Sequence, residues 1–337
     1  MEAFKPLIAK VAAGLPLSRA ESALAFSQML SGEVTPAQMS GFLMALRVRG
    51  ETVEEITGAV SAMRDRMLRV EAPAGAIDVV GTGGDASGSW NVSTLAGLIV
   101  AACGVPVAKH GNRAASSKSG AADVLQALGV KIGQAPDGVA AILRQTNFAF
   151  MLAPAHHPAM RNVAPVRTEL GTRTMFNLLG PLSNPASVKN LLLGVFGASW
   201  LEPIAATLRD LGTERAWIIH GSDGLDELTT TGPSYVVELS GGTIRRFEIS
   251  PEDAGLARSA PEALKGGEPA ENAQALRDVL DAKPGAYRDI AILNAAGALV
   301  VSGKTPTLKE AAEMAAAAID SGQVRSLLAH VIAVSNR

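Results

Sequence analysis

The sequence is poor in cysteine and in long apolar runs, and both shortages limit what the protein can be. Its 337 residues include one cysteine, Cys103, so an intrachain disulfide and a metal site of several thiolates are excluded. We expect Cys103 to be a core residue in a reducing compartment. The longest apolar run covers residues 95–108 and is broken by Gly104 and Pro106, whereas a membrane-spanning helix needs about 20 apolar residues. We therefore expect no membrane partner.

An excess of charge of either sign is also absent. Lys and Arg total 30 against 32 Asp and Glu, which gives a net charge of -2. This balance is far from that of a basic nucleic-acid-binding protein, so we expect no nucleic-acid partner. The first residues contain no basic leader followed by a continuous apolar core. We therefore expect no signal peptide and a cytoplasmic location.

Apolar residues, in contrast, make up 47% of the chain, enough for buried cores in about two domains of ordinary length. In the first 70 residues, the reciprocal capping box that starts a helix occurs three times. Together with an amphipathic N-terminal segment, these boxes predict a small unit of four helices that buries its apolar faces against a partner surface. The capping pairs are Ser18 with Glu21, Thr35 with Gln38, and Thr52 with Glu55.

After about residue 73 the pattern changes to alternating strand and helix signals, which are typical of βαβ units and a mostly parallel sheet. Gly241 and Gly242 predict a hairpin between strands 235–239 and 243–249. In the Ala-rich C-terminal third, the apolar run 290–301 is a candidate for one further strand. The other predicted strands are 77–80, 105–108, 148–152 and 217–220, and the predicted helices include 122–128, 137–144 and 201–211.

A glycine-rich loop, residues 81–85, directly follows the first predicted strand and precedes a helix that starts near Asn91. Glycines let the backbone approach an anion, and a helix N-terminus supplies unpaired N–H groups, so the loop suits a phosphate. A tight turn before a capped helix is the alternative. The loop is not a dinucleotide fingerprint, because Ala86 stands where that motif needs glycine. A Walker A loop ending at Lys304 is excluded by Ala298, and we expect Lys304 in a surface loop.

Two further loops carry charge at the ends of predicted strands. Residues 109–120 contain three cations and no aromatic residue, which favours a small polyanion over a nucleic acid, with a solvated basic loop as the alternative. Asp223, Asp226 and Glu227 follow strand 217–220. Hard oxygen ligands close to an expected phosphate indicate Mg²⁺, with a solvated acidic turn as the alternative.

The fourth polar segment begins at His156 and His157 and continues through several arginines. With five His and one Cys in the chain, we do not expect zinc. Arg167 is the arginine that we select, because a buried guanidinium binds a substrate carboxylate through two parallel hydrogen bonds. A surface or capping role is the alternative for Arg167.

Taken together, the motifs resemble the anthranilate phosphoribosyltransferase family over nearly the whole chain. The resemblance implies an α/β fold shared with pyrimidine nucleoside phosphorylases: a small helical domain plus a larger α/β domain with a mostly parallel central sheet, usually dimeric through the helical part. The helical domain would be 1–72 with a return segment at about 167–190, and the α/β domain 73–166 and 191–337. The motifs are GTGGD at 81–85, NVST at 91–94, KHGNRAASSKSG at 109–120, HHPAMRNVAPVRTELGTRTMFNLLGPLSNP at 156–185, and DGLDEL at 223–228.

The resemblance also implies site residues. Magnesium is expected on Ser93, Asp226 and Glu227, and anthranilate on Gly81, Asn112 and Arg167, with His110 as a wall of its pocket and His156 or His157 as candidates for its entry path. The sequence departs from the family at Trp90, where Phe is usual, and at Ala121, where a Ser near the phosphates is frequent. The residues expected to bind 5-phosphoribosyl 1-diphosphate (PRPP) are Gly81, Gly84, Asp85, Ser89, Asn91, Val92, Ser93, Thr94, Lys109, His110, Gly111, Asn112, Arg113, Ala114, Ala115, Ser116 and Ser117.

The reaction implied by the resemblance is transfer of the phosphoribosyl group of PRPP to the amine of anthranilate in tryptophan biosynthesis. Its products are N-(5-phosphoribosyl)anthranilate and diphosphate. Mg²⁺ and backbone N–H groups would stabilise the departing diphosphate, and positioning would bring the amine onto the sugar carbon. We assign no general base, because an aromatic amine is neutral at pH 7. The alternatives are a pyrimidine nucleoside phosphorylase-like enzyme and a non-enzymatic nucleic-acid-binding relative.

Overall fold

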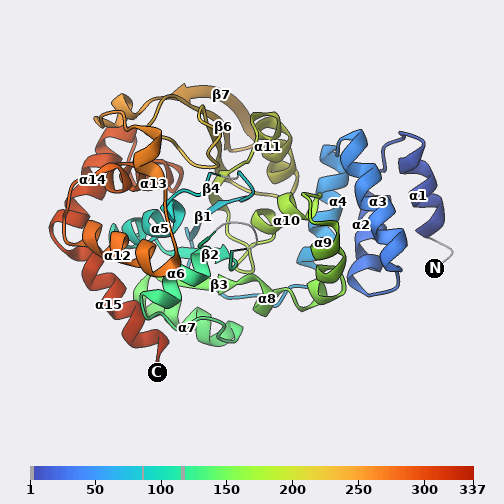
Figure 1. Ribbon diagram of the computed structural model, residues 1–337, viewed down its shortest axis with the longest axis horizontal. Helices are drawn as coiled ribbons and strands as arrows, with labels where there is room; N and C mark the ends of the chain where they lie inside the picture. The colour runs from blue at the N-terminus through green and yellow to red at the C-terminus, as the bar shows by residue number, and fades with distance from the viewer. Residues whose placement is uncertain (1–3, 86, 115–117) are drawn as a thin grey trace.

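The computed structural model describes residues 4–85, 87–114 and 118–337 of the chain (Figure 1). The helical N-terminal part forms as the capping pattern predicts. Ser18 shows the reciprocal geometry, because its Oγ accepts from the Glu21 amide at 3.3 Å while a Glu21 carboxylate oxygen accepts from the Ser18 amide at 2.8 Å. The four helices are α1 (Lys5–Ala12), α2 (Arg19–Leu30), α3 (Pro36–Arg49) and α4 (Val53–Arg64).

Helices from the middle of the chain pack against α2, α3 and α4 (Figure 1). The rings of Phe26 and Phe176 lie 5.3 Å apart between centroids, and the Arg64 guanidinium donates to the Leu182 carbonyl at 2.7 Å. Segments far apart in the sequence therefore share one apolar core. The middle segments are α8 (Ala153–His156), the 3₁₀ helix Pro158–Asn162, α9 (Ala164–Leu170) and α10 (Phe176–Leu182).

A seven-stranded sheet forms the centre of the α/β domain, in the order β3-β2-β1-β4-β5-β6-β7. The first five strands in chain order run parallel, and β6 and β7 form the predicted hairpin at the antiparallel edge. The mostly parallel sheet is thus confirmed. The strands are β1 (Ile77–Gly81), β2 (Val107–Gly111), β3 (Phe148–Leu152), β4 (Asn190–Gly194), β5 (Arg215–Gly221), β6 (Ser234–Ser240) and β7 (Thr243–Ile249).

Two features of the predicted sheet need correction. Strand β4 was absent from the sequence prediction, although its run of leucines is buried at the centre of the sheet. The predicted strand 290–301 is wrong, because these residues belong to the helix α13 (Ala286–Val301). Nearly all of α13 is buried, and a helix buried on all sides has no polar face, so its sequence reads as a continuous apolar run.

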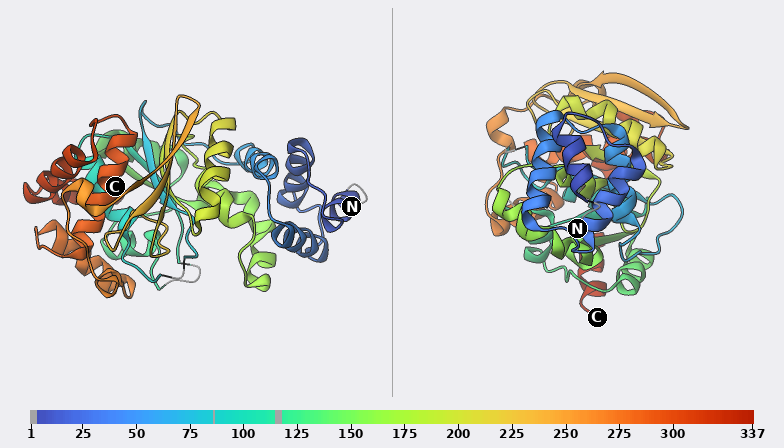
Figure 2. Two further views of the ribbon diagram at one scale, coloured as in Figure 1. Left: turned by 90° about the horizontal axis from the view of Figure 1, so that it is seen from above. Right: turned by 90° about the vertical axis from the view of Figure 1, so that its right-hand side faces the viewer.

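Helices cover both faces of the sheet and make three layers (Figure 2). The sheet is seen on edge in the left view, with the N-terminal helices at the far end of one layer. Within the described ranges, no helix is both long and apolar enough to cross a membrane. One layer holds α10 and α11 (Leu201–Asp210), and the buried side chains of α7 (Pro136–Thr146) belong to the same core. The helices on the other face are α5 (Val92–Ala102), α6 (Ala121–Ala127), α12 (Pro269–Leu280), α13, α14 (Leu308–Asp320) and α15 (Gln323–Ser335).

Candidate active site

The glycine-rich loop after β1 meets the acidic loop after β5 at the carboxyl edge of the sheet. The Gly83 amide donates to the Asp226 carboxylate at 2.7 Å. A Cβ at Gly81 would lie 2.4 Å from that carboxylate, and one at Gly194 would lie 1.6 Å from the Asp226 carbonyl oxygen. Glycine is therefore required at both positions by the close approach of Asp226. Carboxyl ends of parallel strands are where open α/β sheets bind ligands.

Glu227 links the acidic loop to the first turn of α5. Its carboxylate accepts a hydrogen bond from the Ser93 amide at 3.2 Å. The next residue, Leu228, is held by Asn294 of α13, whose amide accepts from the Leu228 N–H at 2.9 Å and donates to the Leu228 carbonyl at 2.8 Å. Sequence reasoning missed Asn294, because it lies in the segment that was taken for a strand.

The carboxylates at this edge lie close together and are buried, which favours the binding of a cation. Burial, and then the charge of Asp85, raises the pKa of Asp226 to about 7. Burial, and then the charge of Asp226, raises the pKa of Glu227 to about 8. One buried oxygen of Asp85 has no hydrogen-bond partner within the described part of the chain. A cation between these groups would relieve their mutual repulsion.

The donor set fits Mg²⁺ better than a metal with an all-protein cage. Among residues 4–85, 87–114 and 118–337, no three His, Cys, Asp or Glu side chains are grouped to hold a metal ion. Mg²⁺ needs no such group, because it is typically bound by one or two carboxylates together with substrate phosphates and water. Asp226 and Glu227, with the Ser93 hydroxyl nearby, supply that set.

Lys109 of β2 lies beside this edge and is buried. Its ammonium donates to the Val79 carbonyl at 2.5 Å and to the Ser93 hydroxyl at 3.1 Å. Burial lowers the pKa of Lys109, while the charge of Asp78 and then that of Glu227 oppose the shift. The structure thus places Lys109, which the resemblance assigns to PRPP, against Ser93 and near the charges of Glu227 and Asp226.

Unlike Lys109, the other described residues expected to bind PRPP do not all direct a free polar side chain toward this edge. The Arg113 guanidinium pairs with Asp123 at 3.0 Å and donates to Gln126 at 2.9 Å, so α6 already neutralises its charge. The side chain of Val92 is buried in the core, which leaves only its backbone for a ligand. Asn112 is exposed, and its side-chain oxygen accepts from the Arg113 amide at 2.8 Å. Ala115, Ser116 and Ser117 lie outside the described residues.

Asn91, before α5, is the centre of a hydrogen-bond network that sequence reasoning missed. Its side-chain oxygen accepts from Asn272 of α12 at 2.8 Å and from the Ser119 hydroxyl at 3.2 Å. The Tyr287 hydroxyl donates to the Asn91 carbonyl at 3.2 Å. Trp90 stacks on Tyr287 with 5.3 Å between ring centroids, so the tryptophan keeps a packing role. No local signal marks Asn272 or Tyr287.

The opposite face of β2 carries His110, which points toward α10. Its Nδ1 lies 3.2 Å from the Gly180 carbonyl oxygen, and its ring centroid lies 5.1 Å from that of His157. Both Nε2 atoms are buried with no hydrogen-bond partner in the part of the chain that the structure describes. Burial lowers the pKa of His157 to about 4 and that of His110 well below its ordinary value. Both rings are therefore neutral at pH 7.

Arg167 of α9 is half-buried, and burial lowers its pKa. Its guanidinium carbon lies 5.7 Å from the centroid of the Phe176 ring. The described residues include no carboxylate paired with Arg167, whereas Arg113 has one. An unpaired, partly desolvated guanidinium of this kind can bind the carboxylate of a ligand.

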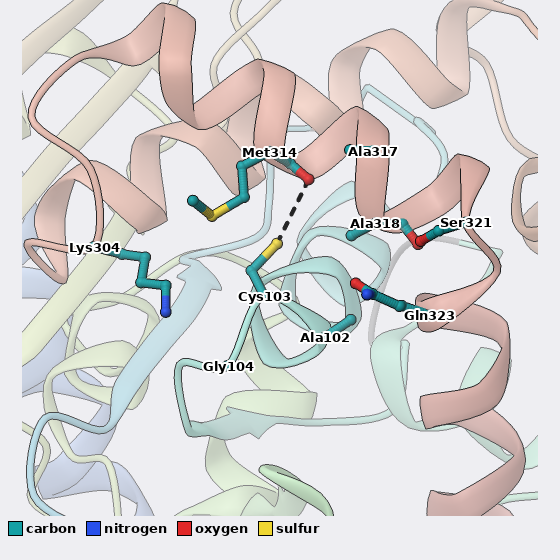
Figure 3. Close-up of a pocket in the computed structure, with 9 residues that line it drawn as sticks. All are labelled: Ala102, Cys103, Gly104, Lys304, Met314, Ala317, Ala318, Ser321 and Gln323. Carbon is teal, nitrogen blue, oxygen red and sulfur yellow. Dashed lines mark hydrogen bonds between the residues drawn. The ribbon is translucent and has the colours of Figure 1, made fainter.

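A separate cavity of about 500 Å³ lies at the other end of α5 (Figure 3). Along the 11 residues of α5, this end is about 15 Å from the carboxylates. Its polar groups include the Cys103 thiol and the Lys304 ammonium, and the thiol hydrogen-bonds the Met314 carbonyl at 3.9 Å. Burial raises the pKa of Cys103 to about 11, so the thiol is protonated and unreactive at pH 7. The chemistry therefore belongs to the strand ends.

Comparisons with known proteins show which family the chain resembles. The helical bundle domain of a glycosyl transferase family matches residues 5–67, and the a/b domain of a glycosyl transferase family matches residues 74–325. The chain is 62% identical over 336 residues to anthranilate phosphoribosyltransferase from Bradyrhizobium sp. (strain BTAi1), which covers 100% of both chains. It is 61% identical to the same enzyme from Azorhizobium caulinodans, covering 97% of this chain and 95% of the relative.

Solved structures show the same similarity. The crystal structure of anthranilate phosphoribosyltransferase from Thermus thermophilus superimposes with a TM-score of 0.93 at 43% identity, covering 98% of this chain and 99% of that one. The enzyme from Saccharomyces cerevisiae in complex with PRPP and Mg superimposes with a TM-score of 0.90 at 30% identity, covering 99% and 98% of the two chains.

Proposed function

The chain belongs to the anthranilate phosphoribosyltransferase family, and we propose that it carries out the family's reaction at the carboxyl edge of its sheet. It transfers the phosphoribosyl group of PRPP to the amine of anthranilate and releases diphosphate, a reaction of tryptophan biosynthesis. The observation that supports this location best is the convergence of Gly81, Gly83 and Ser93 on the carboxylates of Asp226 and Glu227.

The diphosphate is bound on the α5 face of the edge. Lys109 supplies a positive charge there, and the glycine-rich loop and the first turn of α5 supply backbone N–H groups. Mg²⁺, when bound, neutralises the charge that develops on the leaving diphosphate. The residues that would hold it are Ser93, Asp226 and Glu227. This chain's own contribution is a set of dipoles and charges that are already oriented before the reaction.

Anthranilate is bound on the α10 face, between His110 and Arg167. The free guanidinium of Arg167 binds the anthranilate carboxylate, and Asn112 and Gly81 border the amine side of the ring. Neutral His110 and His157 form a wall that accepts an aromatic ring without adding charge. The amine of anthranilate is neutral at pH 7, so catalysis consists chiefly of bringing it onto the sugar carbon.

The active assembly is a cytoplasmic homodimer formed through the helical domain. Large apolar side chains of this domain are exposed, which supports the proposal. Measurement of molar mass by light scattering tests it, and a monomer at micromolar concentration would contradict it. The exposed side chains are Leu15 at 54%, Leu24 at 49%, Val48 at 84% and Leu68 at 45%.

The proposed activity is tested by the loss of anthranilate fluorescence when PRPP is added. We expect the loss to require both PRPP and Mg²⁺ and to be abolished by EDTA. Release of a base from uridine in phosphate buffer, without any loss of anthranilate, would instead support the nucleoside phosphorylase alternative.

A further inference from the structure

The central sheet is open between β1 and β2 on the side of the substrates. Strand β1 is in register with β4 along five residue pairs, from Ile77 to Gly81, and β2 is in register with β3 along five. Between β1 and β2, the register is limited to one pair, Ile77 with Val107. Beyond that pair, the backbone groups that face the gap need other partners, because buried N–H and C=O groups are almost always hydrogen-bonded.

Side chains provide these partners. The Asp78 carboxylate accepts from the His110 amide at 3.2 Å. Asn184, in the loop after α10, donates to the other oxygen of Asp78 at 2.7 Å and to the Ala108 carbonyl at 2.9 Å. Lys109 closes the gap from the opposite face through its bond to the Val79 carbonyl at 2.5 Å. The gap is therefore bridged by side chains and not by a backbone ladder.

The bridge joins the two substrate subsites. Successive residues of a strand point to opposite faces of a sheet, so Lys109 faces α5 and the diphosphate subsite, while His110 faces α10 and the anthranilate subsite. We propose that Asp78 and Asn184 form a positioning clamp that sets the location of Lys109 and His110, and with it the alignment of the anthranilate amine with the sugar carbon. This proposal rests on the subsites of the proposed function.

The burial of Asp78 and Asn184 supports a role in positioning β2. Asp78 is fully buried and Asn184 is 3% exposed, and burial raises the pKa of Asp78 to about 6 against the opposing charge of Lys109. A buried carboxylate is costly for folding unless its partners compensate. The Asp78 carboxylate provides a fixed hydrogen-bond acceptor for β2 where β1 and β2 have no further backbone pairs. Without this acceptor, β2 would be free to shift relative to β1. A sub-ångström shift of β2 would misalign both substrates relative to each other.

The test uses Asn184→Ala and Asp78→Asn in the full-length chain. Each subsite keeps its own contacts, so we expect the KM values for PRPP and anthranilate to change less than about 3-fold, while kcat falls about 10- to 100-fold through misalignment. Asn184→Ser keeps one hydrogen-bond donor and should give a smaller loss of kcat. The matched control is Asn190→Ala, which removes a buried asparagine at the first residue of β4, at the end of the strand away from the candidate active site. This variant should have a lower Tm and an unchanged kcat.

The possible outcomes distinguish failure of the clamp proposal from failure of the proposed function. If the wild-type chain consumes anthranilate with PRPP but both variants keep a kcat within 2-fold of wild type, Asp78 and Asn184 only stabilise the fold and the clamp is rejected. The same conclusion follows if kcat falls no further than in Asn190→Ala at an equal loss of Tm. If Asp78→Asn does not fold, the kcat values of Asn184→Ala and Asn184→Ser decide whether the clamp is rejected. Absence of transfer in the wild-type chain would overturn the proposed function itself.

Discussion

The two faces of β2 differ in how their polar groups are satisfied. On the α5 face, Gly83, Ser93 and Lys109 already donate hydrogen bonds to neighbouring groups. On the α10 face, the Nε2 atoms of His110 and His157 have no partner among the described residues. The first face is organised by charge before any substrate arrives. On the second face, the two neutral histidine rings leave these nitrogen atoms for a ligand.

This difference suits the placement of the two substrates that we propose. A diphosphate carries several charges, and a site for it must be held rigidly against mutual repulsion of its own carboxylates. Anthranilate carries one carboxylate and an aromatic ring, so a single guanidinium and uncharged walls suffice.

Removal of charge from the α5 face should have the largest effect. In the double variant Asp226→Asn with Glu227→Gln, we expect kcat/KM to fall by about 1000-fold or more, with a shifted Mg²⁺ dependence. Folding should be unaffected or favoured, because the two buried carboxylates repel each other. Activity measured against Mg²⁺ concentration, beside the Tm, checks both points. An active double variant with the wild-type Mg²⁺ dependence would contradict the assignment.

The neutral histidines of the α10 face should make stability depend on pH. His157 has its pKa lowered from the ordinary 6.5 to about 4, so between these values the unfolded chain binds more protons than the folded chain. The contribution of His157 to stability therefore rises by about 3 kcal/mol as the pH increases through this window. Asp78, Asp226 and Glu227, with pKa values raised to about 6, 7 and 8, contribute opposite changes of comparable size.

The variant His157→Asn isolates the histidine contribution, because the buried carboxylates are common to both proteins. The change in the free energy of unfolding from pH 4.5 to pH 7, measured with urea, should be less positive in the variant than in the wild type. An equal difference in the two proteins would mean that His157 is not held neutral by the fold.

Arg167, which has no carboxylate partner among the described residues, should discriminate between the substrates. A charge-assisted hydrogen bond contributes about 1.5 to 3 kcal/mol, so Arg167→Ala should raise the anthranilate KM by about 10- to 100-fold and leave the PRPP KM nearly unchanged. Arg167→Lys should recover part of the affinity, since an ammonium lacks the planar fork. Equal effects on both KM values together with a lower Tm would make Arg167 a brace between the domains.

Arg113 should show the smallest effect, although it belongs to the basic loop. Its guanidinium is exposed and already paired with Asp123, and exposed ion pairs contribute at most about 1 kcal/mol. We expect Arg113→Ala to change the PRPP KM by less than about 3-fold. Steady-state kinetics at low and high salt measure this, and a loss comparable to that of Arg167→Ala for anthranilate would show that the side chain leaves Asp123 to bind substrate.

Local signals in the sequence predicted the parts of the fold that depend on neighbouring residues. The capping boxes at Ser18, Thr35 and Thr52 form as predicted, because each joins groups only three residues apart. Strand β4 was missed and helix α13 was mistaken for a strand, because a buried apolar segment has no periodic pattern to distinguish strand from helix. Their conformations depend on the layers that cover them.

The sequence alone determined which residue types stand at 81–85, 226 and 227, and their chemistry predicts phosphate and Mg²⁺ as ligands. Only the tertiary structure decided how those residues are held in place. Asn184 and Asp78 are 106 positions apart in the chain, and Asn272 and Asn91 are 181 apart. Such pairs leave no local signature, because a hydrogen bond between distant residues exists only after the layers have packed and brought the two side chains together.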